Sequence, residues 1–201
     1  ILDYSKIEAG HIEVSKRAIN LQRLGLDVVK LMNARAENKG LSLTFTLDPE
    51  LDIWVMSDLV KLRQIIINLI NNAIKFTDTG NISLAISKYD DQLSFCVTDT
   101  GCGIAKDKQQ EIFEAFTQVA NFSSTAGTGL GLAICQRLVS ALEGNLSLTS
   151  IEGQGSCFFF KIPFEIATEE QIPQQMLTTS TQTESDTCYR ILIVEDNQIN
   201  R

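Results

Sequence analysis

Helical and strand-like segments alternate in a fixed order along most of this chain, and this order limits the folds that it can form. Apolar residues recur with helical spacing over 21–38, 58–76 and 129–142, and a shorter helix is predicted around 106–115. Strands are predicted at 41–47, 53–56, 81–88, 92–98, 145–150 and 156–162. Paired strands between single helices favour one sheet with helices on one face, an α+β two-layer sandwich.

The composition argues against several classes of function. The 201-residue chain has a net charge of -8, so no nucleic-acid partner is predicted. No apolar run reaches the ~18 residues that cross a bilayer, so no membrane contact is predicted for this segment. The five cysteines form no CxxC pair and the single histidine, His11, completes no zinc spacing. Reduced buried thiols are therefore favoured over structural zinc.

Both ends of the chain differ in character from its middle. Residues 1–10 read as a helix that ends at Gly10, because glycine accepts the left-handed conformation after a helix. Residues 167–188 lack aromatics and are dominated by Thr, Gln, Glu and Ser, which is typical of a flexible linker. An apolar strand follows at 191–194. The chain begins without Met and ends abruptly, so we expect it to be a fragment.

The helix predicted at 58–76 has two different faces. Its apolar face is formed by Leu59, Leu62, Ile66, Leu69, Ile70 and Ala73. The other face is polar and carries three asparagines within five residues, although asparagine is a poor helix former. Asn68 and Asn72 are four apart, so their carboxamides point the same way. Such oxygens suit Mg²⁺ that also keeps phosphate and water ligands, and Lys75 could meet a phosphate. A plain solvated face is the competing interpretation.

Two glycine-rich segments could approach a ligand closely. In DTGCGI (99–104), Asp99 ends a predicted strand, and Gly101 and Gly103 allow a sharp turn. GTGLGL (127–132) opens a helix, where backbone N–H groups can hold phosphate. No strand precedes it and no Gly-Lys-Ser/Thr follows, so neither a Rossmann nor a Walker loop fits.

Four motifs in order carry a family resemblance: NLINNAIKF, DTGCGI, FEAF (113–116) and GTGLGL. This order resembles the N, G1, F and G2 boxes of the histidine kinase ATP-binding domain. The resemblance covers about residues 20–165. It implies the Bergerat fold, with a mixed sheet covered on one face by helices, which is shared with type II topoisomerases, Hsp90-like chaperones and mismatch-repair ATPases.

The resemblance also implies roles for individual residues, with ATP and Mg²⁺ as cofactors. Asn72 is the implied principal Mg²⁺ ligand, Asn68 lies beside it at the metal and phosphates, and Lys75 contacts phosphate. Five residues are implied to lie on the adenine and ribose side of the nucleotide: Phe76, Asp99, Gly101, Gly103 and Ile104. Among them, Asp99 is implied to accept a hydrogen bond from the adenine amino group. The triphosphate is implied to be wrapped by Gly127, Thr128, Gly129, Leu130 and Gly131.

One residue in the first motif bears on the type of reaction. Hydrolytic members of the wider fold carry a glutamate at the position that matches Asn68. An amide cannot act as a general base, so the site should hold ATP and hydrolyse it poorly. The loop before Gly127 has no Arg or Lys after Phe116, where many relatives place a basic residue.

The ends of the chain extend the resemblance to hybrid sensor histidine kinases. Residues 1–19 resemble the end of the dimerisation helix and its linker, followed by the catalytic domain at 20–166. After the linker at 167–188, residues 189–201 resemble the first strand of a receiver domain, where Glu195 and Asp196 would help to bind Mg²⁺. The acceptor histidine of the dimerisation domain and the acceptor aspartate of the receiver domain both lie outside these residues. His11 does not lie in the acceptor-histidine motif.

These features together imply a protein-histidine kinase that transfers the γ-phosphoryl group of ATP to a dimerisation-domain histidine. Implied partners are that domain and a receiver domain or response regulator, within a full-length homodimer. The implied location is a cytoplasmic domain of an inner-membrane protein. The alternatives are a degenerate nucleotide-binding module that acts as phosphatase or scaffold, and an ATPase of the wider fold. Phe113 and Phe116 are either lid anchors or plain core aromatics.

Overall fold

The structure is a computed structural model that describes residues 12–117 and 129–172. Three predictions fall wholly or in large part outside these ranges: the helix before Gly10, the linker at 167–188 and the strand that resembles a receiver domain. Gly127 and Thr128 of the fourth motif also lie outside the described residues.

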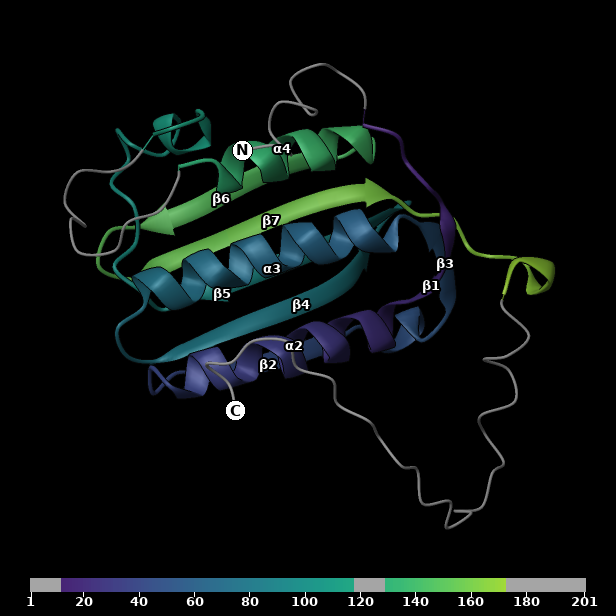
Figure 1. Cartoon of the computed structure of the whole chain (residues 1–201), viewed down its shortest axis with the longest axis horizontal. Helices are drawn as coiled ribbons and strands as arrows, with labels where there is room; N and C mark the ends of the chain where they lie inside the picture. The colour runs from purple at the N-terminus through teal and green to yellow at the C-terminus, as the bar shows by residue number, and fades with distance from the viewer. Residues whose placement is uncertain (1–11, 118–128, 173–201) are drawn as a thin grey trace, which may run out of the picture.

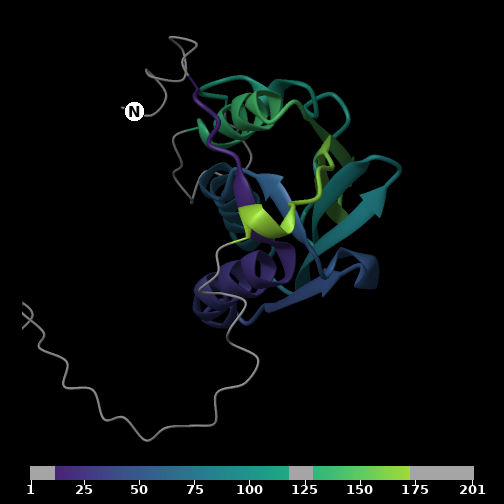
Figure 2. The same cartoon turned by 90° about the vertical axis from the view of Figure 1, so that its right-hand side faces the viewer.

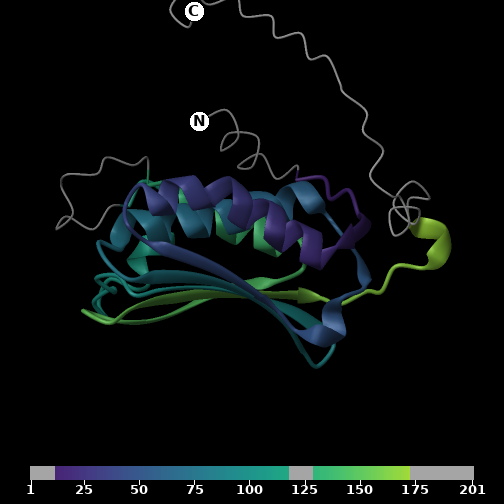
Figure 3. The same cartoon turned by 90° about the horizontal axis from the view of Figure 1, so that it is seen from below.

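A five-stranded sheet forms one layer of the domain, and three helices cover one of its faces (Figure 1, Figure 3). The strands, in spatial order, are β2 (Ser42–Leu47), β4 (Asn81–Tyr89), β5 (Gln92–Asp99), β7 (Gly155–Pro163) and β6 (Asn145–Ile151). The helices are α2 (Leu21–Glu37), α3 (Leu59–Phe76) and α4 (Gly131–Ala141), with 3-10 turns η1 (Pro49–Leu51), η2 (Glu111–Phe113) and η3 (Glu169–Gln171). β2 and β4 pair in parallel and the other neighbours pair antiparallel. The predicted α+β two-layer sandwich with a mixed sheet is confirmed.

A second, two-stranded sheet closes one end of the domain. β1 (Arg17–Asn20) pairs antiparallel with β3 (Trp54–Ser57), at the end that faces the viewer in Figure 2. The sequence did not predict β1, because four residues with one strongly apolar member carry no clear alternation. Ile19 is nevertheless buried, so the chain that enters the domain contributes to its core.

The core lies between the helices and the sheet, and α3 supplies its centre. Leu62, Ile66, Leu69, Ile70 and Ala73 of the predicted apolar face are buried, as is Ile65. Leu59, the first residue of α3, is 38% exposed. On the sheet, Phe95 of β5 and Phe160 of β7 stack with ring centroids 4.7 Å apart.

The predicted helix at 106–115 is wrong. Residues 106–110 form turns, and only the short η2 follows. A helix would place Phe113 and Phe116 on one face, yet the two rings have different surroundings. Phe113 packs edge-on against Phe158 of β7, whereas Phe116 is 67% exposed with φ of 66°. The Gln109 amide donates to the carbonyl oxygens of Ile104 and Ser150, which holds the turn against β6.

Asp58 joins the entering chain to the first turn of α3. It is the N-cap of this helix, which agrees with its position at the start of the predicted helix. Its Oδ1 accepts hydrogen bonds from the N–H groups of Val60 and Lys61. Its Oδ2 accepts the N–H of Ser15 at 2.9 Å and the Lys61 ammonium at 2.7 Å. Burial opposes the charge, but these hydrogen bonds prevail and lower the pKa of Asp58.

Replacing Asp58 by alanine should lower the free energy of unfolding by about 2–3 kcal/mol at pH 7, because it removes the helix cap and the ion-pair partner of Lys61. A lowered pKa means that the ionised carboxylate stabilises the fold above the ordinary value of 3.8. This contribution is lost as the pH falls through the lowered value. Urea unfolding at neutral and acidic pH should show the gap between wild type and variant narrowing in acid. Substitution of the exposed Asp52 serves as control, and a gap independent of pH would contradict the assignment.

Candidate nucleotide-binding site

The residues predicted for the site gather where the C-terminal half of α3 meets the end of β5. Asn68, Asn72, Lys75 and Phe76 are all half-buried, on a helix whose apolar face is sealed against the sheet. Asp99 is the last residue of β5, and the next turn returns to α3, because the Cys102 N–H donates to the Phe76 carbonyl oxygen at 3.2 Å. The first two motifs therefore touch.

Asp99 is a buried carboxylate at the end of a central strand. Its side chain is enclosed, with 6% of the residue exposed. Burial raises the pKa of Asp99, while backbone N–H groups of Gly101 (2.9 Å from Oδ1) and Ser156 oppose this rise. A carboxylate has about four lone-pair positions, so it can accept a further hydrogen bond. A buried acceptor of this kind suits an amino group of a ligand.

The glycines after Asp99 are required by close contacts. A side chain at Gly101 would collide with the carbonyl oxygen of Phe76 and with Oδ1 of Asp99. Gly103 has φ of 67°, and its missing side chain leaves space for the Ile151 carbonyl of β6. Ile104 continues this wall, with its N–H donating to Ser150 Oγ at 2.8 Å. The DTGCGI turn is thus fixed from both sides, by α3 and by the β6–β7 hairpin.

Two of the three asparagines of α3, Asn71 and Asn68, lie next to different helices. Asn71 Oδ1 accepts a hydrogen bond from Arg35 of α2 at 2.8 Å, so this side chain links two helices. Asn68 instead lies near the thiol of Cys135 on α4. Burial raises the pKa of that thiol to about 12, and its Sγ lies 3.9 Å from the Ile65 carbonyl oxygen.

The start of α4 lies close to this face of α3. Gly131 is the first residue of α4, one turn before Cys135, and the helix has no side-chain hydrogen bond at its N-cap residue, Leu130. Gly129 has φ of 68°, and its carbonyl oxygen accepts the N–H of Phe116 at 3.0 Å. The N–H groups of the first turn are therefore available to an anion beside Asn68.

Lys75 is the cation at the C-terminal end of the asparagine face. Its ammonium lies over the ring of Phe76, 4.8 Å from the centroid. The backbone there is held by Lys39, whose ammonium donates to the carbonyl oxygens of Ile74 and Lys75. A positive charge is thus present near the two asparagines.

The donor set is compatible with Mg²⁺. Amide oxygens are hard, neutral ligands, and Asn68 and Asn72 lie one helical turn apart on one face. Within residues 12–117 and 129–172, no cluster of three His, Cys, Asp or Glu side chains could hold a metal by itself.

Sequence reasoning missed two residues of the site. Ser156 on β7 pairs in register with Asp99, and Cys135 contacts Asn68 from α4. Neither residue type signals a ligand site, and both lie far from their partners in the sequence. Gly155, next to Ser156, has a structural reason for being glycine. Its backbone approaches the Asp99 carbonyl oxygen too closely for any side chain.

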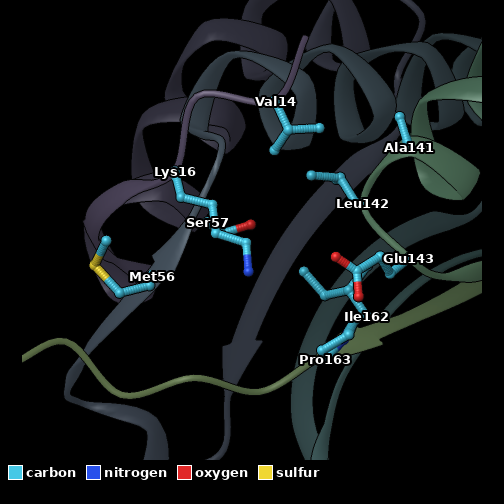
Figure 4. Close-up of a pocket in the computed structure, with 9 residues that line it drawn as sticks. All are labelled: Val14, Lys16, Met56, Ser57, Ala141, Leu142, Glu143, Ile162 and Pro163. Carbon is cyan, nitrogen blue, oxygen red and sulfur yellow. The ribbon is translucent and has the colours of Figure 1, made fainter. Parts of the chain in front are cut away.

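A separate cavity of about 190 Å³ lies at the other end of β7 (Figure 4). Its lining includes Lys16, Met56, Glu143 and Ile162. Ile162 is six residues along β7 from Ser156, which corresponds to roughly 20 Å of strand. The cavity is therefore distinct from the site at Asp99.

A mixed sheet with helices on one face and a buried aspartate beside an asparagine-bearing helix defines the class of Bergerat-type domains. A family model described as histidine kinase-, DNA gyrase B-, and HSP90-like ATPase matches residues 57–166. The chain belongs to this family, as the four ordered motifs predicted.

Similar proteins are sensor kinases. Sensor protein TorS of Escherichia coli (strain K12) is 37% identical over 203 residues, covering 100% of this chain and 21% of TorS. The signal transduction histidine-protein kinase BarA of the same strain is 38% identical over 173 residues, covering 83% of this chain and 19% of BarA. The crystal structure of full-length ShkA in complex with AMPPNP matches with a TM-score of 0.76 and 38% identity, covering 83% of this chain and 35% of that chain. The chain thus spans about a fifth of TorS and BarA.

Proposed function

We propose that this domain binds Mg·ATP and transfers its γ-phosphoryl group to a histidine on a dimerisation domain of the same protein. The observation that carries the proposal is the buried Asp99 carboxylate at the end of β5, where the following turn is hydrogen-bonded to the end of the helix that bears Asn68 and Asn72. The structure of ShkA with AMPPNP supports an adenine nucleotide as the ligand.

Asp99 selects the base in this proposal. Its carboxylate would accept a hydrogen bond from the exocyclic amino group of adenine, and the hydrogen bond from the Gly101 N–H to Oδ1 holds it in place. Guanine presents a carbonyl oxygen at the equivalent position, which would face a negative carboxylate. Gly101, Gly103 and Ile104 form the adjoining wall, and Phe76 packs on the adenine or ribose side.

The triphosphate lies between α3 and the start of α4. Asn72 and Asn68 would hold Mg²⁺ together with phosphate oxygens, and Lys75 would contact a phosphate. The metal would neutralise charge that builds up on the transferred group. Gly129, Leu130 and Gly131 would present backbone N–H groups to the phosphates, and the family resemblance extends this role to Gly127 and Thr128. The protein thus contributes positioning and charge neutralisation.

Asn68 favours phosphoryl transfer to a histidine over hydrolysis of ATP. A hydrolase needs a base to activate water, and an amide cannot accept that proton. ATP is therefore held until a histidine nucleophile reaches it.

The partners of the whole protein belong to the same proposal. They are the dimerisation domain, within a homodimer, and a receiver domain or response regulator that takes the phosphoryl group next. The similarity to TorS and BarA supports this arrangement. Between residues 12 and 117 and between 129 and 172, no helix is both long and apolar enough to cross a membrane. We place this domain in the cytoplasm, where ATP is available, and propose an inner-membrane anchor elsewhere in the full-length protein.

Supplying the missing acceptor in trans tests the proposal. The 201-residue chain is mixed with a helix hairpin of the dimerisation domain that carries the acceptor histidine, and labelled phosphate is followed from ATP. We expect label on the hairpin that is stable in base and labile in acid, and none on the chain alone. A hairpin with the histidine changed to glutamine is the control. Loss of label from pre-phosphorylated hairpin without forward transfer would favour the phosphatase alternative, and rapid release of free phosphate would favour an ATPase.

A further inference from the structure

Two cysteines meet on the face of the sheet opposite α2, α3 and α4, the lower face in Figure 3. Cys96 lies on β5 and Cys157 on the neighbouring β7. Their side chains alternate with Phe95, Val97, Phe158 and Phe160, which are buried under the helices. Both cysteines are half-buried, so small molecules in solvent can reach them.

The two sulfur atoms are 2.7 Å apart. Cys157 is paired in register with Thr98, two residues after Cys96, so the cysteines face each other diagonally across the two strands. A disulfide requires an S–S distance of about 2.05 Å. The remaining gap is less than one ångström, and the paired strands already hold the two side chains together.

We propose that Cys96 and Cys157 form a modification site at which a hydroperoxide oxidises the two thiols to a reversible disulfide. The site lies on the opposite face of the sheet from α3 and is independent of the proposed nucleotide chemistry. Reversible oxidation would thus be the role of a thiol pair that the phosphotransfer reaction does not use.

The reaction balances with hydrogen peroxide as the only co-reactant. The Cys157 thiolate attacks one peroxide oxygen, the O–O bond breaks, and hydroxide leaves and takes a proton to become water. The sulfur of Cys96 then attacks the sulfenic sulfur of Cys157. The S–O bond breaks, the S–S bond forms, and the thiol proton leaves with hydroxide as a second water. Two sulfurs each lose one electron, and the peroxide gains both.

The contact also prepares one sulfur for attack. The hydrogen bond from Cys96 lowers the pKa of Cys157 to about 6 and raises that of Cys96, while burial opposes the change at Cys157. The Thr98 hydroxyl lies 3.4 Å from Cys96 Sγ and is a second polar neighbour of the pair. By contrast, burial and then the charge of Asp99 raise the pKa of Cys102. Cys135 is fully buried.

The lowered pKa gives Cys157 a larger thiolate fraction at neutral pH than an ordinary thiol, although intrinsic nucleophilicity falls as the pKa falls. We therefore expect Cys157 to react with peroxide first, and the pair to be oxidised before Cys102.

Peroxide treatment of the full 201-residue chain tests the proposal, with Cys188 replaced by serine so that the fifth cysteine does not compete. After quenching with iodoacetamide, peptide mass mapping should find Cys96 joined to Cys157 with the loss of two hydrogen atoms. Cys102 and Cys135 should remain reduced, and dithiothreitol should restore both thiols of the pair. Oxidation of Cys102 before the pair, or a bridge between other cysteines, would overturn the proposal.

Single serine variants separate the two steps. Cys96→Ser keeps a hydroxyl donor beside Cys157, so Cys157 should accumulate as a sulfenic acid that a 1,3-dione probe traps. Cys157→Ser should leave Cys96 unlabelled under the same conditions. In urea, where the strands no longer hold the sulfurs together, the preference for the Cys96–Cys157 bridge should disappear. A preference that persists in urea would show that the folded contact is not its cause.

Discussion

Replacing Asn72 by alanine is expected to lower Mg·ATP-dependent transfer to the histidine hairpin by about 100-fold or more. The change removes the amide oxygen proposed as the principal metal ligand, and alanine leaves the helix intact because it is the better helix former. Initial rates of labelled hairpin formation at several Mg²⁺ concentrations measure the effect.

Asn71 offers a matched control one residue away on the same helix. Its side chain is bound to Arg35 of α2 at 2.8 Å, so Asn71→Ala removes an interhelical hydrogen bond. We expect this variant to lose some stability and to keep transfer close to the wild-type rate at a permissive temperature. If Asn72→Ala transfers normally, or if both variants lose transfer equally, the metal assignment is wrong.

Replacing Asp99 by asparagine should weaken ATP binding by about 100-fold, because the buried site is built around an acceptor. Asparagine keeps the shape of the side chain, but its NH₂ group must replace either Oδ1, which accepts the Gly101 N–H, or the oxygen that is proposed to accept the adenine amino group. The Gly101 N–H and the adenine amino group are both donors, so one hydrogen bond is lost and one repulsive contact is gained. Calorimetric titration with ATP measures the loss, and thermal unfolding checks that the variant is folded. Unchanged affinity in a folded variant would remove the basis for the adenine assignment.

The pH dependence of binding gives a second test of Asp99. Burial raises its pKa above the ordinary 3.8, so in the free protein it gains a proton at a higher pH than an exposed aspartate does. The ionised form is the acceptor, so affinity should be full above the raised pKa and fall by up to tenfold per pH unit below it. ATP also titrates, but Asp99→Asn shares that change. The ratio of wild-type to variant affinity should therefore fall in acid.

Much of the fold followed from periodicity, because the helices and sheet strands predicted from it have strong apolar alternation and lie in the core. β1 and the absence of a helix at 106–115 could not be predicted in the same way. β1 exists because it pairs with β3, more than thirty residues away, and the turn at 106–110 is held by Gln109 bonding to β6. Tertiary contacts of this kind leave no local pattern.

The site was predictable to the extent that its residues have unusual chemistry. Helical spacing placed Asn68 and Asn72 together, but composition could not separate them from Asn71, because that distinction depends on Arg35 of another helix. Asp99 stood out as an acid before two glycines. Ser156 and Cys135 carry no such signal, and only the register of β5 with β7 and the packing of α4 on α3 reveal them.

The pairing of Asp99 with Ser156 has a consequence for the order in which the domain matures. β5 borders β7, and β7 is the last strand of the sheet to be synthesised. A nascent chain that lacks residues 155–163 already contains both asparagines and Asp99, yet the central strand has no neighbour on that side and its terminal carboxylate lacks one of its backbone donors. Because such contacts between distant segments form late, nucleotide affinity should appear only when the last hairpin has closed. Ligand binding in this domain therefore reports that folding is complete.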